Sequence, residues 1–486
     1  MSARVWVAEA KRELTKFYID GRWVRPLSEA NVQAVLDPAT CKVSGYVAMG
    51  NQVDVDRAVR AARQAFPGYA ATSVSERLSL LQRICSLYER RLGEIAEAIT
   101  DEMGAPLESL SRTLQAPAGL GHFRVAAECL RTYQFERALG QTRIVREPIG
   151  VCALITPWNW PMNQVVCKVA PALAAGCTVV LKPSQFSSFS AQILAEILDE
   201  AEVPPGVFNM VYGEGRVLGE ALATHPEIEM ISLTGSTAAG AQIARLAADT
   251  IKRVTLELGG KSANIILREA PLERAVEHGV RLMMSNSGQN CTAPSRMLVP
   301  RESLETVRSI AAGVCDSLVV GHPRDVGVQI GPVAHARQFR RVNELLAQAI
   351  EGGAKLIAGA EGRPADLPDG YFVSPAVVEA THDMPVSREE IFGPVLVVTP
   401  YDQEEEAIRL ANDSDFGLSG YVYGPTVARA RSVARKLRTG MVHLNGADVD
   451  FLAPFGGYKR SGNGREWGAF GLEEFLEVKA IMGSEV

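Results

Sequence analysis

The sequence predicts an α/β protein with at least one parallel β-sheet. From residue 150 onward, short runs rich in β-branched residues alternate with longer stretches whose apolar residues recur every three or four positions. Strands that alternate with helices of this length form βαβ units, which build parallel sheets. A second series of the same kind follows residue 258, so two large α/β domains are expected.

Composition and charge limit the class of protein. The chain has 486 residues, 47% of them hydrophobic and 22% charged, with a formal net charge of −6. At roughly 100–200 residues per domain, two to four domains are expected. The mild acidity and the lack of a long basic block argue against nucleic acid or a membrane surface as a partner.

The sequence carries no targeting, membrane or disulfide signal. Residues 1–18 mix charges into each short apolar stretch and lack the apolar core of a secretory signal. The longest apolar tract, Val165–Leu181, contains Lys168 and Pro171 and is shorter than the about 20 residues that span a bilayer. Eight scattered cysteines without a CxxC pair predict neither a disulfide framework nor a metal site. A cytoplasmic location is expected.

The elements can be placed in chain order. Residues 53–66 and 75–104 have the apolar spacing of amphipathic helices. Strands are expected at 151–157, 178–183, 207–212 and 230–235, with helices between them. The second series begins after residues 257–261. The boundary between the two series is the expected place for a site, because parallel sheets bind ligands beyond the carboxyl ends of their strands.

Residues 135–150 and the C-terminal residues 475–486 belong to neither series. Both alternate branched apolar and charged side chains, which is the pattern of a two-sided β-ribbon. Such a ribbon is either an edge hairpin or an oligomerisation arm. The arm is the preferred interpretation, because a hairpin on its own is only marginally stable.

Three residues stand out as candidates for chemistry. Cys291 lies in SNSGQNCTAPSR, where Gly288 permits a sharp turn, so its thiol is expected to ionise more easily than a core thiol and to act as a nucleophile. Glu257 ends the predicted strand RVTLEL, where a desolvated carboxylate can act as a general base. Asn159 in ITPWNWP can donate its amide to an oxyanion. Taken singly, each has a structural alternative: a packed thiol, a surface acid and a buried turn amide.

The segment GSTAAG, residues 235–240, follows a predicted strand and opens a helix. Gly235 permits the turn, and Ser236 with the helix N-terminus can hold a pyrophosphate. Gly213-Glu-Gly215, which precedes another helix, is nearer to the GxGxxG spacing but ends in xxxGly219, and either match alone is weak evidence. No histidine lies near Cys291 to form a Cys–His pair. His122, His225 and His278 are expected to be surface residues.

Taken together and in this order, the motifs resemble the aldehyde dehydrogenase superfamily, from residue 18 to the C-terminus. They are TPWNWP, KPSQ, GSTAAG, LELGGKS, SGQNC, EEIFGPV and PFGGYKRSGNGRE. The resemblance implies catalytic roles for Cys291, Glu257 and Asn159, and a proton relay of Lys168 and Glu466. It implies an aromatic substrate tunnel at Trp160 and Phe455. The residues implied to bind the cofactor, NAD or NADP, are Thr156, Pro157, Trp158, Lys182, Ser184, Gln185, Gly215, Gly235, Ser236, Leu258, Glu390 and Phe392.

The family fold implied is a Rossmann-like cofactor-binding domain (residues 1–127 and 147–257), an α/β catalytic domain (258–457) and a small β oligomerisation arm (128–146 and 458–486). A homodimer or homotetramer would follow. The implied reaction oxidises an aldehyde to the acid through a thioester on Cys291, with Glu257 activating the water. Transfer to coenzyme A is the first alternative, although acylating relatives lack this Glu. A silent binding or structural homologue is the second.

One position departs from the family pattern. The residue three after Lys182 is often Glu in the family, and here it is Gln185. A carboxylate there accepts from the 2′-hydroxyl of NAD and repels the 2′-phosphate of NADP. Gln removes that repulsion and keeps a possible hydrogen bond. The sequence therefore predicts that NADP is accepted beside NAD.

Overall fold

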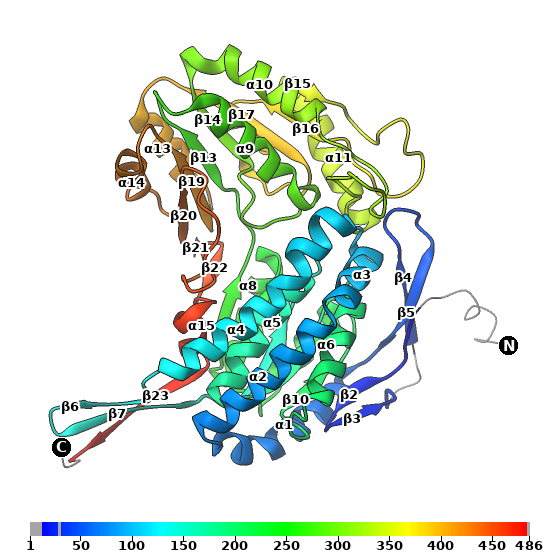
Figure 1. Ribbon diagram of the computed structural model, residues 1–486, viewed down its shortest axis with the longest axis vertical. Coiled ribbons are helices and arrows are strands. Elements are labelled where there is room, and N and C mark those ends of the chain that lie inside the picture. Colours follow the sequence, from blue (N-terminus) through cyan, green and yellow to red (C-terminus); the bar gives the residue numbers. More distant parts are fainter. Residues whose placement is uncertain (1–11, 28–30, 484–486) are drawn as a thin grey trace.

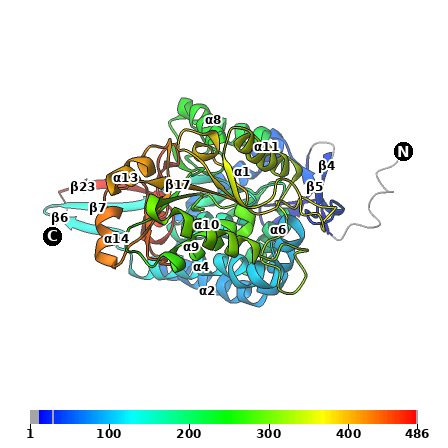
Figure 2. The same ribbon diagram turned by 90° about the horizontal axis from the view of Figure 1, so that it is seen from above.

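The computed structural model describes residues 12–27 and 31–483 (Figure 1). Most of the N-terminal stretch in which a targeting signal was sought, residues 1–11, lies outside the described residues. Two large β-sheets, each flanked by helices, form separate lobes, and a thin three-stranded ribbon projects from one of them (Figure 1, Figure 2). Among the described residues, no helix is long and apolar enough to cross a membrane.

The first sheet has eight strands in the order β22-β12-β11-β8-β9-β10-β2-β3. Its five parallel strands are β8(Val151–Ile155), β9(Thr178–Lys182), β10(Phe208–Met210), β11(Met230–Thr234) and β12(Arg253–Glu257). Numbered along the chain, they lie in the order 3-2-1-4-5. The order reverses between β8 and β11, and ligands bind such sheets at this point, beyond the carboxyl ends of the strands.

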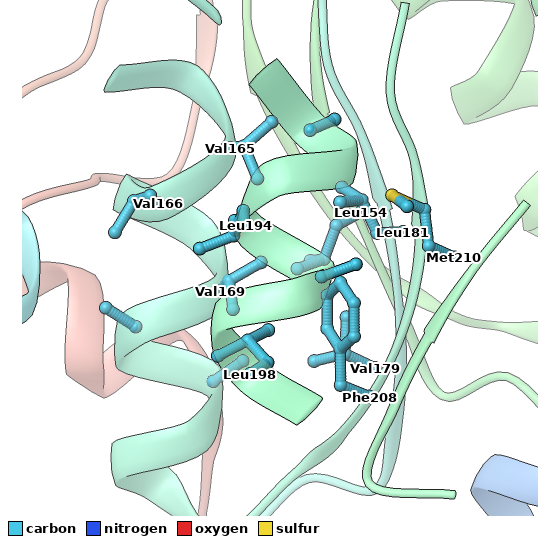
Figure 3. Packing of buried hydrophobic residues seen from close by; sticks show 14 of the residues in the cluster. Leu154, Val165, Val166, Val169, Val179, Leu181, Leu194, Leu198, Phe208 and Met210 are labelled. Atoms are coloured by element: carbon cyan, nitrogen blue, oxygen red, sulfur yellow. The ribbon is translucent and has the colours of Figure 1, made fainter. Parts of the chain in front are cut away.

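The core of this lobe explains why the strands read as nearly continuous apolar runs. Helices α5(Pro161–Ala175) and α6(Ser188–Glu200) pack on β8, β9 and β10, and side chains such as Val165, Val169 and Leu194 meet Leu154 and Phe208 (Figure 3). A parallel sheet covered in this way buries its strands completely. Helices α1(Gln52–Ala70), α7(Gly215–Thr224) and α8(Thr237–Ala247) also belong to this lobe.

The helix expected over residues 75–104 is two helices. α2(Val74–Arg90) and α3(Leu92–Met103) are separated at Arg91, which leaves helical geometry at φ −104° and ψ 10°. Gly104, with φ 73°, ends α3 in the left-handed conformation that glycine adopts readily. A π-helix, η2(Leu107–Gln115), then leads into α4(Ala116–Thr132). The apolar spacing did not reveal the π-helix, because its period is not 3.6 residues.

The second sheet has seven strands, and all but β15 run parallel to their neighbours. In spatial order they are β15(Lys355–Gly359), β16(Ala376–Glu379), β17(Val395–Tyr401), β14(Arg296–Pro300), β13(Ala263–Ile266), β19(Ser419–Tyr423) and β20(Met441–Leu444). The flanking helices are α9(Leu272–Met284), α10(Leu304–Asp316), α11(Ala336–Glu351), α12(Pro385–Arg388), α13(Glu404–Asn412) and α14(Val427–Ala434).

Short elements complete the fold. β1(Arg12–Leu14), β5(Val43–Met49) and β4(Asn31–Leu36) form a small sheet, and β2(Phe17–Ile19) and β3(Arg22–Val24) extend the first large sheet. β18(Phe416–Gly417) pairs with β21(Tyr458–Lys459), while β22(Gly462–Asn463) pairs with β12. The segment from β21 through α15(Gly468–Glu474) therefore touches both lobes.

The projecting ribbon consists of β6(Glu136–Leu139), β7(Thr142–Pro148) and β23(Leu476–Met482), paired antiparallel in the order β23-β7-β6 (Figure 1). The two segments that fitted neither series thus pair with each other. Residues 128–132 belong to α4, and residues 458–474 lie against the lobes. The three paired strands cover only part of the ranges that the resemblance implied for the arm, and those domain bounds and the role of the ribbon in assembly stay predictions.

Candidate active site

The candidate residues lie at two sheet edges that face each other. Asn159 follows β8, Lys182 ends β9, Ser236 follows β11 and Glu257 ends β12. In the second sheet, Cys291 precedes β14, and Glu390 and Phe392 precede β17. The first sheet therefore contributes its carboxyl edge, as expected, whereas the second contributes its amino edge.

Glycines let the loop of Cys291 approach its neighbours closely. Gly288 has φ 70°, and a Cβ there would lie 2.1 Å from the carbonyl oxygen of Gly393. A Cβ on Gly260 would lie 2.4 Å from the carbonyl oxygen of Cys291. Separations under 3.0 Å are not found for real Cβ atoms. Both positions must remain glycine for Cys291 to lie between the two lobes.

The Cys291 thiol is not the easily ionised group that the sequence suggested. Burial, followed by the charges of Glu390 and Glu257, raises its pKa to about 12. The direction is opposite to the one expected from the sequence, because Cys291 is partly buried and the charges of two nearby carboxylates disfavour the thiolate. A neighbouring base is therefore needed to form the thiolate near neutral pH.

The Asn159 side chain is fixed beside the cysteine loop. Its Nδ2 donates to the carbonyl oxygen of Gln289 at 3.0 Å, which occupies one of the two amide hydrogens. The neighbouring Trp160 donates through its indole to Asn290, the residue before Cys291. Asn159 is 3% exposed, so its amide acts in a dry environment, where a hydrogen bond to a developing charge is strong.

Glu257 lies in the electric field of a buried ion pair formed by Lys168 and Glu466. Burial, and then the Glu466 carboxylate, raise the pKa of Glu257 well above its usual value. Within the described residues, neither Glu257 oxygen has a hydrogen-bond partner. Lys168 is paired with Glu466 and donates to Ser232 Oγ at 3.1 Å. Burial alone would lower the pKa of Lys168, but the charges of Glu466, Cys167 and Glu257, together with the hydrogen bond to Glu466, raise it. An unpaired buried carboxylate of raised pKa is suited to accept a proton.

Residues expected to hold a dinucleotide lie at the carboxyl edge of the first sheet. Ser236 caps α8 through Ala239 N, so the N-terminus of an eleven-residue helix opens at this edge. Burial lowers the pKa of Lys182 to about 8, and within the described residues its Nζ has no hydrogen-bond partner. Glu390 accepts from Gly260 N at 3.0 Å. The Lys182 ammonium and the N-terminus of α8 are donors that suit a ribose and a pyrophosphate.

The remaining predicted cofactor residues lie at the same edge of the first sheet. Thr156, Pro157 and Trp158 follow β8, Ser184 and Gln185 follow β9, Gly215 opens α7, Gly235 follows β11 and Leu258 follows β12. Gly215 faces Lys182, since a Cβ there would lie 3.8 Å from its Nζ. The Trp158 and Phe392 rings, from opposite lobes, meet edge to face at 5.6 Å. Both lobes thus contribute residues to the predicted cofactor site.

An aromatic cluster adjoins Cys291. Phe455, Trp467, Cys167 and Leu418 form a buried core against which Cys291 and Phe451 pack. The rings of Phe455 and Trp467 are 4.5 Å apart. Trp467 was not singled out from the sequence, although it directly follows Glu466. It is buried with φ 70°, a strained conformation for a bulky residue.

His122 is buried, which corrects the expectation of a surface histidine. Its ring stacks on Phe451 at 4.6 Å, and its Nε2 lies 2.8 Å from Asn163 Oδ1. Burial lowers its pKa to about 4, so the ring is neutral at physiological pH. The helical pattern of α4 placed His122 on a helix correctly, but it could not show that α5 and residue 451 cover that face. His225 and His278 are partly buried.

Two α/β lobes that bring Cys291, Glu257 and Asn159 to facing edges of their sheets match the fold of aldehyde dehydrogenases. The model of the aldehyde dehydrogenase family matches residues 23–481, and the chain belongs to that family. The resemblance found in the motifs and the fold it implied are confirmed. The enzyme class is therefore NAD(P)-dependent aldehyde dehydrogenase.

Several relatives cover almost the whole chain. A protein from Pseudomonas sp., named 3-succinoylsemialdehyde-pyridine dehydrogenase, is 58% identical over 98% of this chain and 99% of its own. Among solved structures, a cysteine-to-alanine mutant of aldehyde dehydrogenase C from Pseudomonas syringae, with NAD+ and octanal, is 50% identical, with a TM-score of 0.95 and 96% of each chain covered. The NAD+ complex of a Mycobacterium tuberculosis aldehyde dehydrogenase is 38% identical, with a TM-score of 0.94, and the match covers 98% of this chain and 99% of that one.

Proposed function

We propose that the chain oxidises an aldehyde to the free carboxylic acid, using NAD+, with Cys291 as nucleophile and Glu257 as general base. The observation that carries this proposal is the arrangement of the two lobes. Glu257 has an unpaired, buried carboxylate that is electrostatically coupled to Cys291, and Asn159 is held against the Cys291 loop through Gln289. The family membership supports the same reaction.

The proposed steps use these residues in order. The Cys291 proton passes to Glu257, whose raised pKa favours its acceptance. The sulfur adds to the aldehyde carbon, and the resulting oxyanion accepts from the second Asn159 amide hydrogen and from the Cys291 backbone N–H. NAD+ supplies a hydride acceptor. The thioester left on Cys291 is cleaved by a water molecule that Glu257 deprotonates.

Lys168 and Glu466 are proposed to carry protons away from Glu257. The Glu466 charge helps to raise the Glu257 pKa, and the Lys168 ammonium opposes this effect. A proton that Glu257 accepts can therefore be stabilised or released through this pair. Coenzyme A as acyl acceptor is the competing possibility, and retention of Glu257 argues for water instead.

We propose that the substrate is an aldehyde that carries an aromatic or heteroaromatic ring. Phe451, Phe455 and Trp467 pack in one cluster with Cys291, and Trp160 is fixed beside it. The Pseudomonas sp. relative carries pyridine in its name. Aromatic rings bind well between other rings, because edge-to-face and offset contacts add to the burial of apolar area. Higher kcat/KM for octanal than for aryl aldehydes would contradict this substrate class.

The cofactor, assembly and location complete the proposal. Lys182, Ser184 and Gln185 would hold the adenosine ribose, Ser236 the pyrophosphate, and Glu390 with Phe392 the nicotinamide end. NADP would be accepted beside NAD+. The enzyme would act in the cytoplasm as a homodimer or homotetramer assembled through the β6–β7–β23 ribbon.

One experiment separates the reaction from its competitors. The protein is incubated with NAD+ and an aryl aldehyde, with and without coenzyme A, and the products are separated by mass spectrometry. Free acid without coenzyme A is expected, together with its complete loss in Cys291→Ala that still binds NAD+. An acyl-coenzyme A product alone, or acid formed by Cys291→Ala at the unmodified rate, would contradict the proposal.

A further inference from the structure

A chain of hydrogen bonds joins the π-helix η2 to the oxyanion side of the site. Gln115, the last residue of η2, donates from Nε2 to Asn286 Oδ1 at 3.0 Å. Asn286 donates from Nδ2 to the backbone carbonyl of Asn159 at 2.9 Å, and to that of Gln289 at 3.4 Å. The carbonyl of Gln289 is also the acceptor for the Asn159 side chain. Three side chains and two carbonyls thus form one network.

The network is dry and leaves little freedom. Gln115 is fully buried and Asn286 is 2% exposed, so water cannot replace a lost bond at either residue. The Gln289 side chain closes the loop from the other side, because its Nε2 donates to Asn286 O at 3.1 Å and its Oε1 accepts from Ala334 N at 2.9 Å. A buried polar network that is almost fully satisfied holds its members in one arrangement.

The backbone is shaped to make these bonds. Asn286 has φ 54° and ψ 32°, and Ser287 has nearly the same angles. The left-handed conformation is tolerated by Asn but is unfavourable for most residues. π-Helices are rare and occur frequently at functional sites. The wider turn of η2 places Gln115 where its amide reaches Asn286, so two unusual backbone segments converge on one hydrogen bond.

Both ends of the Asn286 amide are held. The Asn286 side chain has a donor end and an acceptor end of nearly the same shape. The two backbone carbonyls can only accept, so they fix Nδ2 toward Asn159 and Gln289, and Oδ1 then faces η2, where it accepts from Gln115 Nε2. Without the Gln115 donor, the buried Oδ1 would lose this hydrogen bond, and Asn286 would be held at one end only.

We propose that Gln115 and Asn286 are positioning residues for the oxyanion site: they hold the backbone of Asn159 and the carbonyl of Gln289 so that the second Asn159 amide hydrogen points at the reacting oxygen. This inference rests on the proposed roles of Cys291 and Asn159. Gln115 acts only through Asn286 and touches no reacting atom.

The test compares Gln115→Met with a control in the same helix. Met has nearly the length of Gln and no donor, so it removes the bond with little change in packing. The control is Ser111→Ala. Ser111 is equally buried in η2, but its hydroxyl bonds to Ala105 and Thr100, away from the site. Asn286→Asp is the second variant, because Asp tolerates the left-handed conformation and removes the Asn286 donor.

The readouts are the pre-steady-state rate of NADH formation, the KM for NAD+ and the melting temperature, with benzaldehyde as the probe. A displacement of about 1 Å in a reacting group can cost about 100-fold in rate. Gln115→Met and Asn286→Asp are expected to slow NADH formation at least about tenfold, with the KM for NAD+ within about twofold of the unmodified protein. Ser111→Ala is expected to keep the unmodified rate whatever its melting temperature.

The outcome is decisive in each case. If Gln115→Met and Asn286→Asp form NADH as fast as Ser111→Ala, or if all three slow in proportion to their loss of stability, the positioning role is wrong. Should Gln115→Met fail to fold, Asn286→Asp alone decides between these results. Activity retained by Cys291→Ala would instead overturn the proposed function, which is a separate result.

Discussion

At the scale of single residues, the proposed mechanism depends on the pKa values of Cys291 and Glu257, which burial raises in both cases. Cys291 and Glu257 are both acids whose charged forms are disfavoured by desolvation, and each lies in the field of the other. Moving the thiol proton to the carboxylate keeps the total charge constant, so the buried pair carries only one negative charge before and after the transfer. Asn159 carries no charge, and its proposed role is to direct an amide hydrogen at the oxyanion.

The raised pKa of Glu257 gives the reaction a predictable pH dependence. Glu257 is a base only when ionised, and its ionised fraction grows as the pH rises through its raised pKa. Acid release should therefore accelerate with rising pH in the unmodified protein. Glu257→Gln has no such group, so its release should be slow and independent of pH over the same range. Stopped-flow measurement of turnover after the NADH burst checks this, and a Glu257→Gln variant with an unchanged pH profile would assign the base elsewhere.

Gly260 offers a steric test of how closely the lobes approach. In Gly260→Ala the new Cβ would lie 2.4 Å from the Cys291 carbonyl oxygen, so the cysteine loop must move. We expect a loss of kcat of about 100-fold, the magnitude for a displaced reacting group. Gly313→Ala in α10 is the matched control, because nothing lies within 4 Å of its Cβ. Its activity should be unchanged. Equal kcat in both variants would show that the loop tolerates displacement.

At the scale of elements, the periodic patterns predicted the strands of the first sheet and most of its helices. The strands β8, β9, β10 and β11 begin and end within two residues of the expected ranges, because each is short, largely apolar and buried on both faces. The break at Arg91 and the π-helix η2 were not predicted. Both depend on what the helices pack against, which a local pattern does not encode.

The ribbon allows an element-scale prediction. Val478 and Met482 lie on one face of β23 and are 59% and 76% exposed. If this face pairs with another copy of the chain, Val478→Glu/Met482→Glu should reduce the assembly toward the 52.4 kDa monomer, because carboxylates in an apolar interface are strongly unfavourable. Light scattering after size exclusion measures the mass. Val326→Glu, at a 93% exposed position outside the ribbon, is the control. An unchanged mass in the ribbon variant would place the interface elsewhere.

At the scale of the whole molecule, the site depends on bringing the carboxyl edge of one sheet to the amino edge of the other. The resemblance to the family selected Cys291, Glu257 and Asn159 from three separate segments of the chain, and the fold brings all three to facing edges. Each motif taken alone left a structural alternative open for its residue. The sequence did not predict the contacts of Gln115, His122 and Trp467, because these contacts form only when the helices and lobes pack together.

Residues from distant parts of the chain also meet at the predicted cofactor site. Gln185 follows β9, and its Nε2 lies 3.5 Å from the Oε1 of Gln33 on β4. Two neutral amides there neither repel a 2′-phosphate nor hold it strongly. We expect turnover with saturating NADP+, with kcat/KM lower than for NAD+ by no more than about 100-fold, and Gln185→Glu should raise that preference. Steady-state kinetics with both cofactors decide this. Undetectable turnover with NADP+ would contradict the prediction.

The central claim is that a covalent acyl group forms on Cys291 and is released by Glu257. The most direct measurement is mass spectrometry of Glu257→Gln after mixing with NAD+ and an aryl aldehyde and quenching in acid. We expect a mass increase equal to one acyl group, located on the tryptic peptide that contains Cys291, and no such increase when NAD+ is omitted. NADH formation with the acyl group on another residue, or with no acyl group on the trapped protein, would contradict it.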